Sequence, residues 1–305
     1  MVNIGGYSLY LNCTGHGGPT VVLENGLGDV STTWSLVQPK ISKYAQVCSY
    51  DRAYDGFSDR GPIPWTFHQE VFELHQLLRA AGIEPPYILV GNSVGGLLNQ
   101  LYKNIYPDEV VGIVLVDSTH VDTVMGPGPL RKIADGTPVP MGKTMADAPP
   151  PPLTKEEQEI QDRALANVAK QNEAPLPHPY DLIPRENQPV YRWEHSHPKL
   201  PPSVPGPQVN WWANEMQQMY LDRQRKVDFY GDMPLLVLAA QDSATNPERL
   251  RQVNDMVQMS TNSMLIIDTK ADHNIQLTSP DLVVWSIRRV LDTVHSHSKL
   301  HDIKE

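Results

Sequence analysis

A serine with glycine two residues before it and two after it is the clearest chemical feature of this sequence. Residues 91–95 read Gly-Asn-Ser-Val-Gly, after a short apolar run and before apolar residues at helical spacing. This pattern predicts a buried strand that turns sharply into a helix, where only glycine leaves room for the chain to fold back. A serine on such a turn has an exposed hydroxyl. Ser93 is therefore the predicted nucleophile.

A nucleophilic serine needs a base within hydrogen-bond reach, and the sequence offers 11 histidines. We select His273, which follows the last predicted strand and precedes the final helix. A histidine there lies over the carboxyl edge of a parallel sheet, the edge where Ser93 also lies. His120 follows a strand end too, but it breaks the expected order of nucleophile, acid and base. The remaining candidates lie in a Pro-rich region or in the polar C-terminal tail: His195, His197, His295, His297 and His301.

An acid must orient the histidine, and two aspartates follow predicted strands. Asp242 comes just after the strand predicted at residues 235–240, which gives the expected order Ser93, Asp242, His273. Asp117 ends the preceding strand and would face the same edge, although it could also cap the loop that follows. Chain order favours Asp242, with Asp117 as the alternative.

Two backbone N–H groups should stabilise the negative charge that develops on the substrate oxygen. One belongs to Val94, at the start of the predicted helix, where amides have no intrahelical partner. The other is expected from the loop at residues 24–29, in which Gly26 and Gly28 let the backbone approach a substrate. Leu27 is the predicted donor in this loop.

These residues require a sheet with covering helices to bring them together. The first 120 residues alternate strand-like and helix-like segments, which favours a mostly parallel sheet. The predicted strands are residues 8–13, 20–24, 47–51, 87–90 and 112–117, and a helix is predicted at 67–81. Alternation resumes at residue 234, with strands at 234–240 and 263–268 and helices at 247–259 and from 279 onward.

The intervening segment, residues 121–232, has a different character and holds 18 of the 28 prolines. A capping box at residues 154–157 opens a helix predicted at 156–170, and a second helix is predicted at 210–226. Because alternation resumes afterwards, this segment reads as an inserted, largely helical lid. Residues 1–120 and 233–305 then form one core domain.

The charge and composition of the chain disfavour several kinds of partner. The net charge of −10 argues against nucleic acid and anionic membranes, because both attract positively charged surfaces. No apolar run approaches the roughly 20 residues of a transmembrane helix, and residues 1–7 lack signal-peptide character. We expect a soluble, cytoplasmic protein. The alternative is an exported protein from which a signal peptide has been removed. The two cysteines have no metal-ligand or redox spacing, and no metal or other cofactor is expected.

Three features resemble the α/β-hydrolases of esterase, lipase and lactonase type. They are the sharp turn at residues 91–95, here called the elbow, the chain order of nucleophile, acid and base, and the segment Tyr50-Asp-Arg-Ala. The resemblance covers about residues 1–120 and 233–295. It implies an α/β-hydrolase fold with Ser93 as nucleophile, His273 as base and Asp242 as acid. It also implies that Leu27 and Val94 form the oxyanion hole.

The sequence departs from that family's usual pattern at several positions. Asn25 stands where the oxyanion loop usually has histidine, residues 54–56 replace a Gly-x-Gly turn, and Asp272 replaces a common glycine. Asn92 replaces a frequent histidine, and an Asn-Ser pair resembles hydrolases of carbon–carbon bonds. Those enzymes usually carry tryptophan after the catalytic histidine, where this chain has Asn274.

The family's strand order makes the segments of Cys13 and Cys48 neighbours. A disulfide is therefore possible and would point to an exported enzyme. Two buried thiols are the favoured reading for a chain without a signal.

The sequence predicts a metal-free serine hydrolase that acts on a small, apolar carboxylic ester. The pocket would lie under the lid and be lined in part by Trp211, Trp212 or Met216, which could equally form the core of the lid. The same machinery could cleave a lactone, an amide or a carbon–carbon bond. A non-catalytic ligand-binding relative would lack a member of the triad. The sequence does not fix the oligomeric state.

Overall fold

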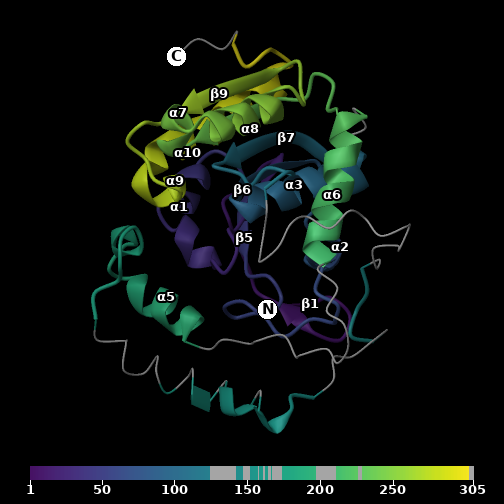
Figure 1. Ribbon diagram of the computed structural model, residues 1–305, viewed down its shortest axis with the longest axis vertical. Coiled ribbons are helices and arrows are strands. Elements are labelled where there is room, and N and C mark those ends of the chain that lie inside the picture. The colour runs from purple at the N-terminus through teal and green to yellow at the C-terminus, as the bar shows by residue number, and fades with distance from the viewer. Residues whose placement is uncertain are drawn as a thin grey trace.

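A computed structural model of the chain describes residues 1–123, 142–146, 152–156, 158–160, 162–163, 166, 174–196, 211–225 and 229–301 (Figure 1). Its centre is a seven-stranded sheet in the order β3-β5-β4-β6-β7-β8-β9. Only β3 runs antiparallel to its neighbour, and the other pairs are parallel. These strands are β3 (Leu11–Thr14), β4 (Thr20–Glu24), β5 (Val47–Tyr50), β6 (Tyr87–Asn92), β7 (Val110–Val116), β8 (Leu235–Ala239) and β9 (Ser263–Ile267). A separate hairpin pairs β1 (Val2–Asn3) with β2 (Ser8–Leu9).

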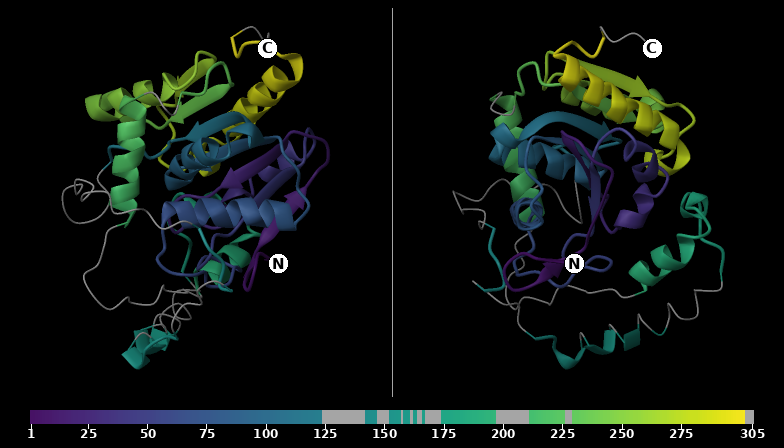
Figure 2. Two further views of the ribbon diagram at one scale, coloured as in Figure 1. Left: turned by 90° about the vertical axis from the view of Figure 1, so that its right-hand side faces the viewer. Right: turned by 180° about the vertical axis from the view of Figure 1, so that it is seen from behind.

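Helices cover both faces of the sheet. On one face pack α2 (Phe67–Ala80), α3 (Val94–Ile105) and α8 (Pro247–Val257). On the other pack α1 (Gln38–Ile41) and α10 (Pro280–Ser296), and the view from behind in Figure 2 shows α10 in front of the strands. Short helical elements occupy the loops: η1 (Ser31–Trp34), η2 (Pro107–Glu109), α7 (Asp242–Thr245) and α9 (Ile275–Thr278).

The central strands bury both faces, so their sequences are almost continuously apolar. In β6, Leu89 belongs to the core under α2 and α3, whereas Ile88 and Val90 belong to the core under α10. Because successive side chains point to opposite faces, one strand serves both cores. This arrangement confirms the predicted α/β-hydrolase fold with a mostly parallel sheet.

Between β7 and β8 the described residues add no strand to the sheet. They include η3 (Tyr180–Leu182), α5 (Gln188–His195) and α6 (Trp211–Gln224). Figure 1 shows α6 on the side of α2 and α3, and α5 on the opposite side, below α1. The helix expected at 210–226 is α6, and the described residues of the helix expected at 156–170 are helical from 155 to 166.

Two local expectations were wrong. The strand predicted at residues 8–13 is divided at Tyr10, so that β2 pairs with β1 and β3 pairs with β5. Helix α5 was not predicted, because prolines surround it and its apolar residues are few. Pro189 nevertheless lies in its first turn, where a missing N–H costs nothing.

The preference for two free thiols was also wrong. Cys13 and Cys48 lie directly opposite each other in the β3–β5 ladder, and the structure joins them in a disulfide across 35 residues of chain. Only the pairing register decides this, since a shift of one residue would point the two side chains to opposite faces. Among the described residues, no helix is long and apolar enough to span a membrane.

Candidate active site

Ser93 occupies the turn between β6 and α3, as the sequence predicted. Its backbone has φ 55° and ψ −122°, a conformation that is strained for any residue other than glycine. Strand β6 ends at Asn92 and helix α3 begins at Val94, so the serine alone makes the reversal. Strain of this kind is typical of functional sites, where surrounding packing maintains it.

The two glycines of the elbow are required by close packing. A Cβ on Gly91 would lie 2.5 Å from Asn99 Nδ2 and from the backbone of Gly95. A Cβ on Gly95 would lie 2.5 Å from the carbonyl oxygen of Asn25, which belongs to the loop after β4. Helix α3 therefore comes close enough to this loop for the elbow and the predicted oxyanion loop to form one site.

His273 is hydrogen-bonded through Nδ1 to Asp117 Oδ2, at 2.6 Å. Asp117 directly follows β7 and is 3% exposed. Its other oxygen, Oδ1, accepts from the backbone N–H of Ala240 at 3.1 Å and from Arg249 Nη2 at 2.9 Å. Both oxygens of the carboxylate are thus engaged, which fixes the histidine ring and leaves Nε2 directed away from the aspartate.

This geometry corrects the preferred acid. Asp242 does not contact His273: its side chain is 54% exposed, and its recorded partner is Arg249 Nε at 3.7 Å. Strand β8 ends at Ala239, and the chain turns at once into α7, which carries Asp242 outward. Asp117 instead remains on the line of β7, because its N–H still bonds to Leu238 of β8.

The pair has shifted pKa values. The hydrogen bond that His273 donates to Asp117 raises the pKa of His273 above its usual value, against the opposing effect of burial. Burial alone would raise the pKa of Asp117, but the hydrogen bond from His273 and the charge of Arg249 together lower it. The aspartate is therefore ionised and stabilises the protonated form of the imidazole.

Asn92 connects the elbow to the histidine loop, a role that sequence reasoning missed. It is fully buried, and its Nδ2 donates to the carbonyl oxygen of Val116 at 3.0 Å and to that of His273 at 3.1 Å. The residue beside Ser93 thus anchors the backbone of His273. A single sequence gives no signal for this bond, because it joins residues 181 positions apart.

The structure also brings a second carboxylate to the site. Asp29, at the end of the predicted oxyanion loop, is 6% exposed, and its Oδ1 accepts from Tyr180 of η3 at 3.1 Å. A Cβ on Gly26 would lie 3.0 Å from Asp29 Oδ2 and 3.6 Å from Ser93 Cβ, so both atoms border the same glycine. Burial raises the pKa of Asp29.

The predicted oxyanion donors come from two neighbouring elements, helix α3 and the glycine-bearing loop. Val94 is the first residue of α3, and Leu27 lies in the loop after β4. Within the described part of the chain, neither backbone N–H has a recorded acceptor. Both therefore remain predicted donors for a substrate oxygen.

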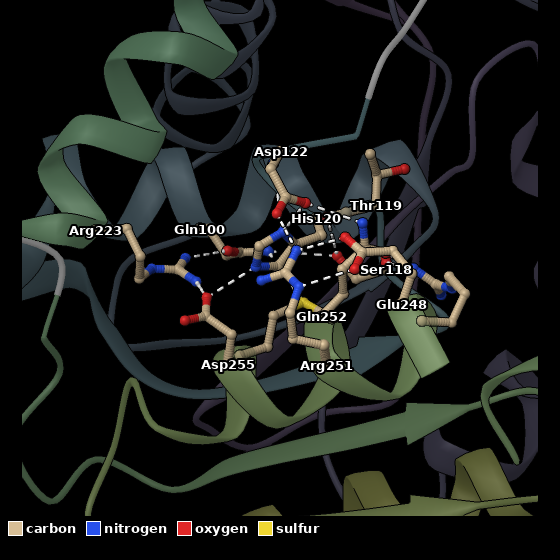
Figure 3. A network of polar contacts seen from close by, with 12 residues as sticks. Gln100, Ser118, Thr119, His120, Asp122, Arg223, Glu248, Arg251, Gln252 and Asp255 are labelled. Atoms are coloured by element: carbon tan, nitrogen blue, oxygen red, sulfur yellow. Dashed lines mark hydrogen bonds and ion pairs between the residues drawn. The ribbon is translucent and has the colours of Figure 1, made fainter. Parts of the chain in front are cut away.

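His120 has a different environment from His273. Figure 3 shows its ring between Asp122 and Asp255, in a network that reaches Arg223 of α6. Its Nε2 lies 2.8 Å from Asp255 Oδ2, Nδ1 contacts Asp122, and the residue is 1% exposed. With both nitrogens occupied, His120 connects α8 and α6 and has no free nitrogen to serve as a base.

Among the described residues, no other histidine bonds to Asp117. His195 Nδ1 bonds to the carbonyl oxygen of Tyr191, and His295 Nε2 bonds to that of Gly18. His301 Nε2 bonds to the carbonyl oxygen of Ser263, and His297 ends helix α10. His197 lies outside the described residues.

The residues expected to line the pocket have packing contacts in this structure. Trp212 stacks on Phe67 with ring centroids 5.3 Å apart, and it meets Trp65 edge to face at 4.8 Å. Met216 is fully buried in the core that includes α2 and α3, and Trp211 is partly buried. Their contact with a substrate stays a prediction. Among the described residues, no group of three or more His, Cys, Asp and Glu could hold a metal ion.

Comparison with known proteins supports the same architecture. The chain matches the family model described as alpha/beta hydrolase fold over residues 19–280. It is 36% identical to the uncharacterized protein YqjL of Bacillus subtilis (strain 168) over 103 residues, 34% of this chain. That match spans only 41% of the length of YqjL.

Two solved structures are similar over nearly the whole chain. An esterase from Thermogutta terrifontis has a TM-score of 0.60 and 19% identity, covering 95% of this chain and 94% of its own. An enol-lactonase from Burkholderia xenovorans LB400 has a TM-score of 0.59 and 17% identity, covering 95% and 98%. At such identities the likeness establishes the fold.

Proposed function

Because the chain belongs to the α/β-hydrolase fold family, we propose that it is a serine hydrolase that cleaves a carboxylic ester through an acyl-enzyme. Ser93 Oγ attacks the ester carbonyl while His273 Nε2 accepts its proton. His273 then returns the proton to the alcohol that leaves. Water, activated by the same histidine, hydrolyses the acyl-enzyme and regenerates Ser93.

Asp117 holds His273 in the tautomer with a proton on Nδ1 and stabilises the imidazolium. The N–H groups of Leu27 and Val94 donate to the tetrahedral oxyanion. The observation that carries the proposal is the 2.6 Å hydrogen bond between His273 Nδ1 and Asp117 Oδ2. It supplies an oriented base at the sheet edge where the strained elbow presents Ser93.

We further propose that residues 121–232 are an inserted lid on a core formed by residues 1–120 and 233–305. The support is that β7 and β8 are parallel neighbours in the sheet although this whole segment separates them. Two of its described helices, α5 and α6, lie on opposite sides of the core (Figure 1). Tyr180 of this segment reaches Asp29, which would place part of a substrate pocket beneath it.

The proposal also concerns which type of bond the protein cleaves. The Asn-Ser pair gave a reason to consider carbon–carbon bonds, but the Asn92 amide donates to two backbone carbonyls and so has a structural explanation. Lactones and amides need the same nucleophile, base and oxyanion donors as esters. We therefore propose esters as the first substrate class to test and lactones as the second.

The test combines one variant with a covalent probe. Ser93→Ala should lower turnover of an activated short-chain ester by about 10⁴-fold or more and abolish labelling by a fluorophosphonate. Ser42→Ala is a matched control, because the side chain of this partly buried serine donates to the carbonyl oxygen of Pro39 in its own helix. It should retain both signals. Labelling of folded Ser93→Ala would contradict the assignment of the nucleophile.

Substrates matched in acyl length then assign the bond. An ester, a lactone and an amide of equal size are compared by kcat/KM with the wild-type protein. A wild type that neither hydrolyses any of them nor reacts with the probe would instead indicate a non-catalytic binding protein.

A further inference from the structure

Arg52 lies beneath the loop that carries the predicted oxyanion donor. It belongs to the segment Tyr50-Asp-Arg-Ala after β5, and β5 is the direct neighbour of β4, which leads into that loop. The guanidinium is 1% exposed and faces the ends of both strands. It has no path to a substrate through solvent, so it can act only through the groups that it touches.

Those groups are two carbonyl oxygens of the loop and the carboxylates of Glu24 and Asp55, the latter with its Oδ2 at 3.6 Å from Nη2. Arg52 Nη1 donates to the carbonyl oxygen of Asn25 at 2.7 Å, and Nη2 donates to that of Gly26 at 2.5 Å. Nη1 also forms an ion pair with Glu24 Oε1 at 2.8 Å. A planar guanidinium with donors in a fixed fork can hold two successive peptide groups at once, which a lysine ammonium cannot do equally well.

The orientation of one carbonyl determines that of the next N–H. The peptide between Gly26 and Leu27 is planar and trans, so its C=O and N–H point in opposite directions. When Arg52 holds the oxygen of Gly26 inward, the N–H of Leu27 must point outward, away from the guanidinium. The loop borders Ser93 at this point, since a Cβ on Gly26 would lie 3.6 Å from Ser93 Cβ. Glycine has few steric limits on φ and ψ, so without a fixed partner this peptide could rotate.

A second donor shares the same oxygen. The backbone N–H of Asp29 donates to Gly26 at 3.2 Å, a longer contact than the 2.5 Å bond from Arg52. A hydrogen bond from a charged guanidinium is stronger than one from a neutral backbone amide. Removal of Arg52 should therefore weaken the arrangement without abolishing it.

We propose that Arg52 is a positioning residue that orients the Gly26–Leu27 peptide so that its N–H can stabilise an oxyanion. The proposal rests on the proposed function for its kinetic consequence, but its structural consequence is independent of any activity. It predicts a loss of transition-state stabilisation with little change in substrate binding.

The test uses Arg52→Lys, which keeps the buried positive charge but loses the planar fork. The matched control is Glu73→Gln, a change to a buried carboxyl that bonds to Tyr7 and Gln69 on the same side of the sheet and does not touch the loop. Thermal melting shows that each variant is folded. Arg52→Gln, alone and with Glu24→Gln to remove the opposing charge, provides further variants if Arg52→Lys is poorly folded.

Three readouts separate positioning from general damage. In Arg52→Lys, kcat should fall about 10- to 100-fold, less than the 10²- to 10³-fold typical for loss of a whole donor, and KM should stay within about threefold. The Kd of a boronic acid, which forms a tetrahedral adduct with a nucleophilic serine, should rise by a factor similar to the fall in kcat. In a crystal structure, the Gly26–Leu27 peptide should be rotated or present in two orientations. Glu73→Gln should leave all three unchanged.

The outcomes can be told apart from failure of the proposed function. If the wild type has no hydrolase activity and binds no boronic acid, the serine mechanism fails, and the crystal structures still decide the role of Arg52. An unchanged peptide orientation in folded Arg52→Lys overturns the positioning role. An unchanged kcat, or a lower kcat with unchanged boronic acid affinity, overturns its contribution to the oxyanion hole.

Discussion

Asp117 has a partner for each of its carboxylate oxygens, whereas Asp242 lies on the surface. Arg249 stands between them, since it pairs with Asp117 at 2.9 Å and approaches Asp242 at 3.7 Å. The two aspartates are thus the inner and outer neighbours of the same arginine. Only the inner one contacts His273.

Substitution of each aspartate tests this distinction. Asp117→Asn should lower kcat by about 10⁴-fold, because an amide cannot stabilise the imidazolium and favours the wrong tautomer. Asp242→Asn should leave kcat within about threefold, since an exposed ion pair contributes little. Steady-state ester kinetics on the two folded variants make the comparison. A larger loss in Asp242→Asn would restore the acid that chain order favoured.

At the scale of elements, α6 is joined to α2 by a buried carboxylate. Glu215 accepts from the backbone N–H of Phe67 and from that of His68, both at 2.8 Å, and also contacts His68 Nδ1. The first amides of a helix have no partner within it, so a carboxylate from another helix can satisfy them. Glu215 therefore stabilises the start of α2 while fixing the position of α6.

Loss of this contact should weaken both elements. Glu215→Ala should lower the free energy of unfolding by about 1–3 kcal/mol, because buried N–H groups lose their acceptor. Gln218→Ala on the same helix is the control, since its side chain bonds, among the described residues, to Asp222 one turn later. Urea denaturation followed by circular dichroism measures the difference. Equal stability of the two variants would show that water replaces the carboxylate.

The disulfide joins the edge strand β3 to β5 and closes 35 residues of chain. Cys13→Ala with Cys48→Ala should lower the free energy of unfolding by about 2–4 kcal/mol, mainly by releasing the unfolded chain. The measurement is urea denaturation of the double variant and of the oxidised wild type. Addition of a reductant should shift only the wild type, and a wild type insensitive to it would indicate free thiols in solution.

At the scale of the whole molecule, a group of carboxyls is buried on the α2 side of the sheet. Burial raises the pKa of Glu73 to about 7 and that of Asp55 to about 6. For an acid whose pKa is higher in the folded state, the unfolded chain loses its proton first. The stability contribution of Glu73 is then full below pH 4.5 and declines as pH rises toward 7.

Glu73→Gln should remove this pH dependence. The amide oxygen can still accept from Tyr7 and Gln69, so the variant and the wild type should be equally stable near pH 4.5. At pH 8 the variant should be more stable by an amount on the order of 3 kcal/mol, the equivalent of the pKa shift. Denaturant titrations of both proteins across this range test it. A stability difference independent of pH would refute the shifted pKa.

The sequence determined the features that depend on neighbouring residues. Alternating apolar segments predicted the parallel sheet and most helices, and the glycines at 91 and 95 predicted the elbow before any tertiary contact was known. Residues 93 and 273 followed from their positions after strands, because parallel strands bring their carboxyl ends to one edge. Local chemistry was sufficient to place Ser93 at the turn between β6 and α3 and His273 after β9, while their catalytic roles are part of the proposed function.

Where two similar residues could contact the same partner, only the tertiary structure decided between them. Asp117 and Asp242 both follow strands, and only the path of the chain after β7 and β8 separates the carboxylate that reaches His273 from the one that turns outward. Tertiary structure likewise decided three other contacts: the disulfide between Cys13 and Cys48, the hydrogen bond from Asn92 to the His273 carbonyl, and the hydrogen bond from Arg52 to the Gly26 carbonyl. Each joins residues distant in sequence, and their geometry is set by strand register and packing rather than by residue type.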